Sequence, residues 1–140
     1  MAEIDKARLI ELAEAKLEDA KLLLNAGCAA NAYYLAGYAV ECALKACIAK
    51  GTQRYDFPDR RSVDASHTHN LKDLIRVAEL ETARLEEALI NPVFKNYWDV
   101  VQQWTEHSRY RRNNLDMART LVEAAGNGKH GVIVWIKRHW

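Results

Sequence analysis

The segment AANAYYLAGYAVECALKACIAK, residues 29–50, decides the fold. Its apolar side chains fall at nearly every position around a helix, and such a helix is stable only when several neighbours bury it. Glu41 and Lys45 interrupt the apolar run, which leaves too few uncharged residues to cross a bilayer. We therefore expect residues 29–50 to be the central helix of a bundle, with no membrane as a partner.

A second helix is predicted before the central one. Its apolar residues recur at steps of three and four, on one face of an amphipathic helix: Ile10, Ala13, Leu17, Ala20 and Leu24. Gly27 then suits the left-handed conformation that often ends a helix. The two helices are expected to form a tight hairpin.

Helical spacing returns after the central helix. It resumes at Asn70 and continues weakly to Asn91-Pro92, where proline prevents continuation. A further amphipathic helix is predicted from Phe94 to Trp104. Asn113 and Asp116 resemble a capping pair for the next helix, which is closed by Gly126-Asn-Gly128. The last segment, residues 132–140, fits either a strand or a helix.

Length and composition agree with this pattern. The length of 140 residues predicts a single domain that covers residues 1–140. The low content of 2 prolines and 6 glycines argues against a many-stranded sandwich. The polar stretch at about residues 51–67 is predicted to be a long loop. The predicted fold class is all-α, an up-and-down helical bundle of five or six helices.

Charge and cysteine content exclude several function classes. Lys plus Arg number 20 and Asp plus Glu 19, so no overall field favours nucleic acid or a membrane surface. Three cysteines without a CxxC spacing indicate reduced thiols. The first residues alternate acids and bases with no apolar stretch, so we expect no secretory signal and a cytoplasmic location.

The basic residues are concentrated near the C-terminal end. The last forty residues hold seven bases against three acids, a balance of +4. Arg109, Arg111, Arg112 and Arg119 follow His107, and guanidinium groups at a helix start are typical of a phosphate site. A solvated basic turn, or arginines paired with acids of other helices, is the alternative.

Three further groups of residues each have two interpretations. Glu41 and Lys45 are one turn apart, the spacing of a mutual ion pair. The alternative is that Glu41 reaches the arginine cluster and positions it. His67 and His69 with Asp64 resemble a sparse metal site, but ordinary histidines explain them better, and we predict no metal and no cofactor. The aromatic residues could stack on bases but fit a core better: Tyr97, Trp98, Trp104 and Tyr110.

Four features in order resemble the HEPN family, the higher eukaryote and prokaryote nucleotide-binding domains. They are the helix AYYLAGYAVECALK at 32–45, the start HNLKDL at 69–74, Trp104 followed by Arg109-Tyr110, and a later helix with alanines. The resemblance covers residue 5 to about residue 125. It implies an up-and-down helical bundle that often forms a homodimer, frequently beside a nucleotidyltransferase partner in prokaryotic toxin–antitoxin modules.

Many HEPN proteins are metal-independent ribonucleases in which four to six residues separate a catalytic arginine from a histidine that follows it. No histidine follows Arg109, Arg111 or Arg112 at that distance, and the pattern occurs only from Arg60 and Arg61 to His67. We therefore predict no catalytic residues at the family position. The preferred interpretation is a noncatalytic module that binds a nucleotide, RNA or a partner protein. Its expected ligand-binding residues are Glu41, His69, His107, Arg109, Tyr110, Arg111 and Arg112.

Two alternatives to that interpretation stay open. One is a ribonuclease toxin that uses Arg60 or Arg61 with His67, or residues borrowed across the dimer. The other is a structural adaptor whose apolar surface binds another protein.

Overall fold

The predicted central helix lies in the middle of the structure, a computed structural model that describes residues 5–54, 67–110 and 114–140, with the backbone alone for 51–54, 109 and 110. The elements in chain order are α1 (Lys6–Asn25), α2 (Ala29–Arg54), α4 (Leu71–Val77), α5 (Glu81–Ile90), α6 (Pro92–Val101), the 3-10 helix η1 (Glu106–Tyr110), α7 (Leu115–Gly126) and α8 (Val132–Lys137). The all-α fold class is confirmed, since these described ranges contain helices and no strand.

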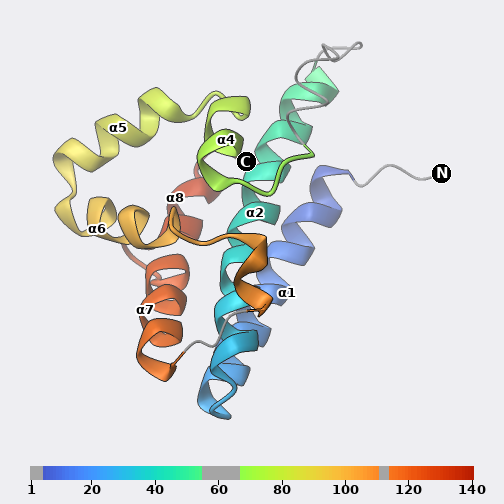
Figure 1. The fold of residues 1–140 in the computed structure, drawn as a ribbon. Coiled ribbons are helices and arrows are strands. Elements are labelled where there is room, and N and C mark those ends of the chain that lie inside the picture. The colour runs from blue at the N-terminus through green and yellow to red at the C-terminus, as the bar shows by residue number, and fades with distance from the viewer. Residues whose placement is uncertain (1–4, 55–66, 111–113) are drawn as a thin grey trace.

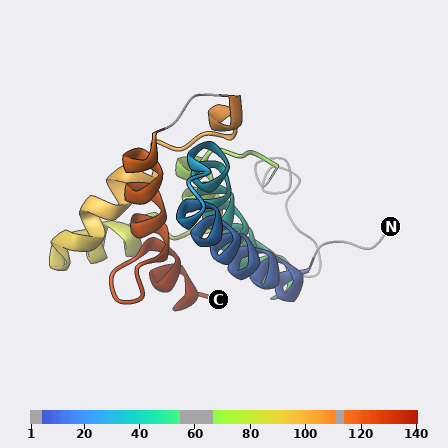
Figure 2. The ribbon, with the colours of Figure 1, turned by 90° about the horizontal axis from the view of Figure 1, so that it is seen from below.

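Helix α2 is the element that the others share. It contacts α1, α4, η1, α7 and α8, while α5 and α6 pack farther out, α6 against α7 (Figure 1). Figure 2 shows the α1–α2 hairpin on one side and α5 to α8 on the other. An apolar helix in this position is buried on most faces, as its composition predicts.

The turn between α1 and α2 has the predicted form. Gly27 adopts a φ of 81°, and the amide of Cys28 donates to the carbonyl of Leu23 at 2.8 Å. A left-handed residue followed by this backward hydrogen bond closes the helix end. The two long helices therefore run antiparallel.

The core contains the small residues of α2 and the large residues of its neighbours. Ala36, Ala39 and Ala43 are fully buried, which lets other helices approach the α2 backbone closely. Two of the three thiols also lie in the core, and burial raises the pKa of Cys42 and of Cys47 to about 11. Both are therefore neutral and protected at physiological pH.

Two predicted segments differ in the structure. The segment from Asn70 to Asn91 is two helices rather than one, because Glu79 takes a φ of 61° between α4 and α5 and the next residue, Leu80, is buried. Helix α2 continues to Arg54, into the stretch predicted as a loop, of which residues 55–66 lie outside the description.

Two helix boundaries also differ, and the last segment, which fitted either a strand or a helix, is a helix. Helix α6 ends at Val101, so Trp104 is buried in a connection and not on the helix. The cap of α7 is Asn114, whose Oδ1 accepts from the amide of Met117 at 2.8 Å, whereas Asn113 lies outside the described residues. Residues 132–137 are helical because Val132, Trp135 and Ile136 fall on one buried face.

The described residues thus contain seven α-helices, slightly more than the five or six predicted. None of these helices combines the length and the apolar character needed to cross a bilayer.

The position of α2 makes a prediction for Leu44, which has no exposed surface. Leu44→Ala should lower the free energy of unfolding by about 2–5 kcal/mol, because it removes buried methyl groups and leaves a cavity. Leu22→Ala is the control, since Leu22 is 66% exposed, and should change it by about 0.5 kcal/mol or less. Urea denaturation measures both, and equal losses would mean that α2 is not central.

Candidate functional site

Among the described residues, Glu41 is the charged side chain that is buried in the core. It lies on α2 and is 1% exposed, among apolar neighbours. Its Oε2 lies 3.3 Å from Nζ of Lys45, so the predicted mutual pair is confirmed. A buried carboxylate needs such partners, because leaving water without them costs several kcal/mol.

The second partner of Glu41 is His69, which lies just before α4. Nδ1 of His69 lies 2.9 Å from Oε1 of Glu41, so the two carboxylate oxygens face different groups. This contact joins residues 28 positions apart in the chain. The alternative that Glu41 reaches an arginine involves side chains outside the description.

The start of α4 holds His69 in place. Asn70 caps the helix, since its Oδ1 accepts from the amides of Lys72 at 2.9 Å and Asp73 at 3.2 Å. The amide of Asn70 in turn donates to Oγ1 of Thr68 at 3.1 Å. Thr68 and Asn70 flank His69, and the hydrogen bonds that their side chains accept from the backbone restrict where the His69 ring can lie.

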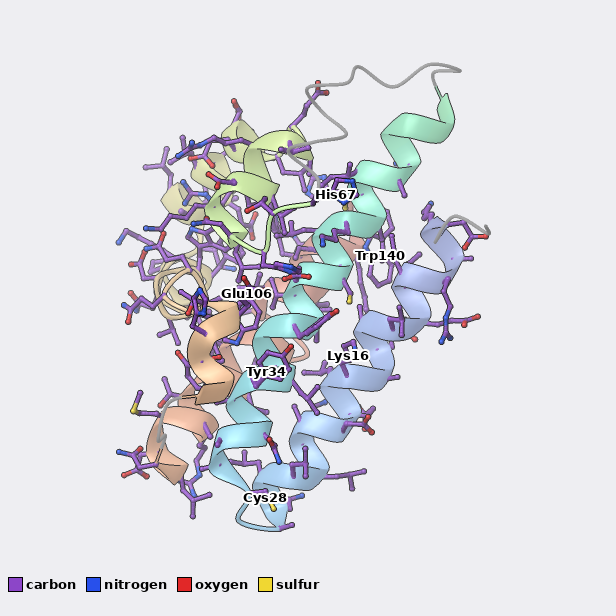
Figure 3. All side chains as sticks on the ribbon, turned by 45° about the vertical axis from the view of Figure 1, so that its right-hand side comes forward. Lys16, Cys28, Tyr34, His67, Glu106 and Trp140 are labelled. Carbon is purple, nitrogen blue, oxygen red and sulfur yellow. The ribbon has the colours of Figure 1, made fainter. Side chains whose placement is uncertain are left out.

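The other nitrogen of His69 faces η1. Nε2 lies 3.3 Å from Oε2 of Glu106, which is on the first turn of η1, and Figure 3 shows Glu106 where η1 meets α2. The imidazole therefore bridges a buried carboxylate and a half-exposed one. Because the carboxylates lie at opposite nitrogens of the ring, one metal ion cannot contact all three side chains.

A steric contact fixes the chain just before η1. The Trp104 ring lies against Gly37 of α2, so close that a Cβ at position 37 would be 2.2 Å from the ring atoms. The ring of Tyr34 lies beside it, with centroids 6.0 Å apart. Within the described residues the buried Nε1–H of Trp104 has no acceptor.

Tyr38 completes the polar group on this side of α2. Burial, followed by the charge of Glu41, raises the pKa of its phenol, so the phenol keeps its proton. Nζ of Lys16, on α1, lies 4.4 Å from the centroid of the Tyr38 ring, a cation–π distance. Figure 3 shows Lys16 on α1 and Tyr34 on the neighbouring part of α2.

The structure brings together some of the residues that the sequence singles out. Glu41 and His69 are in contact, and His107 is exposed on η1. Arg109 and Tyr110 belong to η1, although their side chains lie outside the description. Arg60, Arg61, Arg111, Arg112 and Asp64 lie outside the described residues altogether.

Other predicted residues have ordinary roles. His67 is exposed, and Figure 3 shows it at the opposite end of the molecule from Cys28. Arg119 pairs on the surface at 2.9 Å with Asp116 of its own helix α7, whereas the alternative for the basic residues expected acids of other helices. Trp98 and Trp104 are each 2% exposed, which confirms the core interpretation for these two.

Sequence reasoning missed Glu106 and the anchoring by Trp104. One signal was present for the former, because Glu106 is the one acid between Trp104 and the arginines. The contact between Trp104 and Gly37 has no such signal, since it depends on how the connection after α6 folds back onto α2.

Comparison with known proteins identifies a family. The family model described as HEPN domain matches residues 7–127, from the second residue of α1 through α7, and this range contains the whole group around Glu41. Neither the curated proteins nor the solved structures include a match.

The bridge makes a prediction for His69. His69→Ala should lower the free energy of unfolding by about 1–3 kcal/mol, because the buried Glu41 carboxylate loses a hydrogen-bond partner. His67→Ala is the matched control two residues away, and as an exposed change it should cost about 0.5 kcal/mol or less. Urea denaturation that gave the two variants equal stability would contradict the bridge.

Proposed function

Because the chain belongs to the HEPN domain family, we propose that it is a noncatalytic module that binds a nucleotide or RNA through its phosphate groups. The binding surface, the η1 surface, consists of His107, Arg109 and Tyr110 on η1 with Arg111 and Arg112 after it. Glu41 and His69 position this surface and are not expected to contact the ligand. The observation that carries the proposal is the bridge from Glu41 through His69 to Glu106.

The bridge supports binding because it fixes η1 on the core. A backbone segment such as η1 that is already held on the core when the ligand arrives loses less conformational entropy on binding. The three arginines of the η1 surface carry guanidinium forks that match phosphate oxygens in pairs. Arg119 is left out of this surface, because its guanidinium is engaged with Asp116.

The same bridge supports a noncatalytic role. A general acid or base must exchange a proton with the substrate through a free position. Both nitrogens of His69 face carboxylates, at 2.9 and 3.3 Å, so neither is turned toward a substrate.

The test is the salt dependence of RNA binding. Fluorescence anisotropy with a 5′-labelled single-stranded RNA should show an affinity that falls as salt rises, with a slope of about −0.7 per neutralised phosphate. Arg111→Ala and Arg112→Ala should each make that slope less steep by the amount that one phosphate contact contributes, about 0.7. Arg119→Ala is the matched control and should leave it unchanged.

Two outcomes would overturn this proposal. If the double variant of Arg111 and Arg112 binds with unchanged affinity and slope, the arginines form a solvated turn and the adaptor interpretation replaces it. If the protein cuts RNA in the presence of a chelator, and His67→Ala abolishes the cutting, the chain is a metal-independent ribonuclease that uses His67 with Arg60 or Arg61.

We also propose that the module is a homodimer. Four large apolar side chains around the corner between α5 and α6 support this, because they are exposed by 41–85%: Leu85, Leu89, Ile90 and Val93. Exposed apolar groups that gather in this way mark protein contacts more often than isolated ones do. The nucleotidyltransferase-type partner, and with it a place in a toxin–antitoxin module, stays a prediction of the family resemblance.

Light scattering tests the dimer. The protein should have twice the mass of one chain at micromolar concentration, and Leu89→Asp should reduce it to a monomer, because the charge would be buried in the interface. Leu22→Asp places the same charge on α1, on a residue that is also exposed, and should leave the dimer intact. A monomeric protein, or dissociation by both variants alike, would contradict the proposed surface.

A further inference from the structure

A small cavity lies where α4, α5 and α6 meet, away from the η1 surface. Its volume is about 90 Å³, and six residues line it: Lys72, Arg76, Glu81, Arg84, Trp98 and Gln102. In Figure 1 this junction is at the upper left of the molecule, beside α4. Three of the six lining side chains are cations and one is an anion.

Arg84 is held rigidly at the wall of this cavity. Its Nη2 lies 2.7 Å and its Nε 3.4 Å from the two carboxylate oxygens of Glu81, a bidentate pair. The guanidinium also lies over the Trp98 ring, 5.3 Å from the centroid. The hydrogen bond from Arg84 lowers the pKa of Glu81, so this carboxylate is charged and offsets Arg84.

Lys72 and Arg76 supply positive charge that no carboxylate lining the cavity offsets beyond Glu81, which is paired with Arg84. They are four residues apart on α4, and like charges at that spacing repel. Arg76 has one long ion pair, at 3.8 Å to Asp73, and within the described chain the Lys72 ammonium has no partner. The lining side chains, with three positive charges and one negative, therefore hold two net positive charges at a concave surface.

The cavity has room for a small anion that could neutralise these charges. Its volume of about 90 Å³ is enough to admit a phosphate group. The Lys72 ammonium, the Arg76 guanidinium and the Gln102 amide are all donors to phosphate oxygens.

We propose that this cavity, the α4–α6 cavity, is a second phosphate-binding subsite of the module. The inference deepens the proposed function and rests on it, since the phosphate belongs to the same RNA or nucleotide. Helix α4 connects the two places, because His69 precedes it and contacts η1, while Lys72 and Arg76 lie on it. Along α4 from Leu71 to Arg76 the helical rise is about 8 Å, a span that a short oligonucleotide covers.

The first experiment uses inorganic phosphate and does not depend on RNA. In ¹H–¹⁵N spectra, phosphate should shift the indole N–H of Trp98 and the Nε–H of Arg84 saturably, while chloride at equal ionic strength should not. Lys72→Ala with Arg76→Ala should abolish the saturable shifts. Lys95→Ala on α6 is the matched control, since this exposed lysine is paired with Asp99 outside the cavity.

The second experiment links the α4–α6 cavity to the ligand. The double variant of Lys72 and Arg76 should weaken binding of single-stranded RNA about tenfold, the equivalent of one charge-assisted hydrogen bond. An RNA without terminal phosphates separates the two sources of phosphate. If its binding weakens too, the subsite takes an internal phosphodiester, and if only ATP or 5′-phosphorylated RNA is affected, it takes a terminal phosphate.

The outcomes distinguish this inference from the proposed function. If phosphate causes no saturable shift at Trp98, or if the double variant shifts like the unmodified protein, the subsite is overturned. If binding of unphosphorylated RNA, 5′-phosphorylated RNA and ATP depends on Arg111 and Arg112 but in no case on Lys72 and Arg76, the subsite is also overturned, while the proposed function stays intact. Saturable phosphate shifts in a protein that binds neither RNA nor ATP would instead overturn the proposed function and the assignment of the phosphate to it.

Discussion

The buried carboxylate of Glu41 is the constraint on which the surrounding structure depends. A charge at 1% exposure on an apolar helix must have partners, and one turn of α2 supplies only Lys45. The second oxygen obtains its partner from His69, which sets where the chain must return after residue 66. The far side of the same imidazole then contacts Glu106, so the position of η1 follows from the needs of a residue on another helix. Helical spacing explains the contact with Lys45 but neither of the other two.

Much of the fold could be predicted because it depends on patterns within single segments. The periodicity of residues 10–24, the all-round apolar character of residues 29–50 and the glycine at 27 each act locally, and each prediction is confirmed. Boundaries were less predictable where tertiary contacts decide them. Burial of Leu80 ends α4 early despite continuing helical spacing, and the cap of α7 falls on Asn114 rather than its identical neighbour. Two asparagines in succession carry the same local signal, so only the geometry of the chain selects between them.

The candidate site was predictable in part for the same reason. Glu41 and His69 stand out as polar residues in an apolar helix and at a helix start, but spacing alone could pair Glu41 only with Lys45. Glu106 and the cavity residues on α4, α5 and α6 come together through packing of helices that are not adjacent in the sequence. Helix α4, although it has only seven residues, takes part in both the contact between His69 and Glu106 and the cavity. Its cap fixes His69 on one side, its apolar residues enter the core, and its basic residues reach the cavity.

The contact between Gly37 and Trp104 makes these two positions a single steric unit. The absence of a side chain at 37 leaves a notch in the surface of α2, and the indole ring fills it. Bulk can therefore be moved between the two positions but not added to both. A chain with a larger residue at 37 would need a smaller one at 104, and the connection leading to η1 would then rest at a different height above α2. The size of one residue in the middle of a long helix thus sets how far η1 stands from the core.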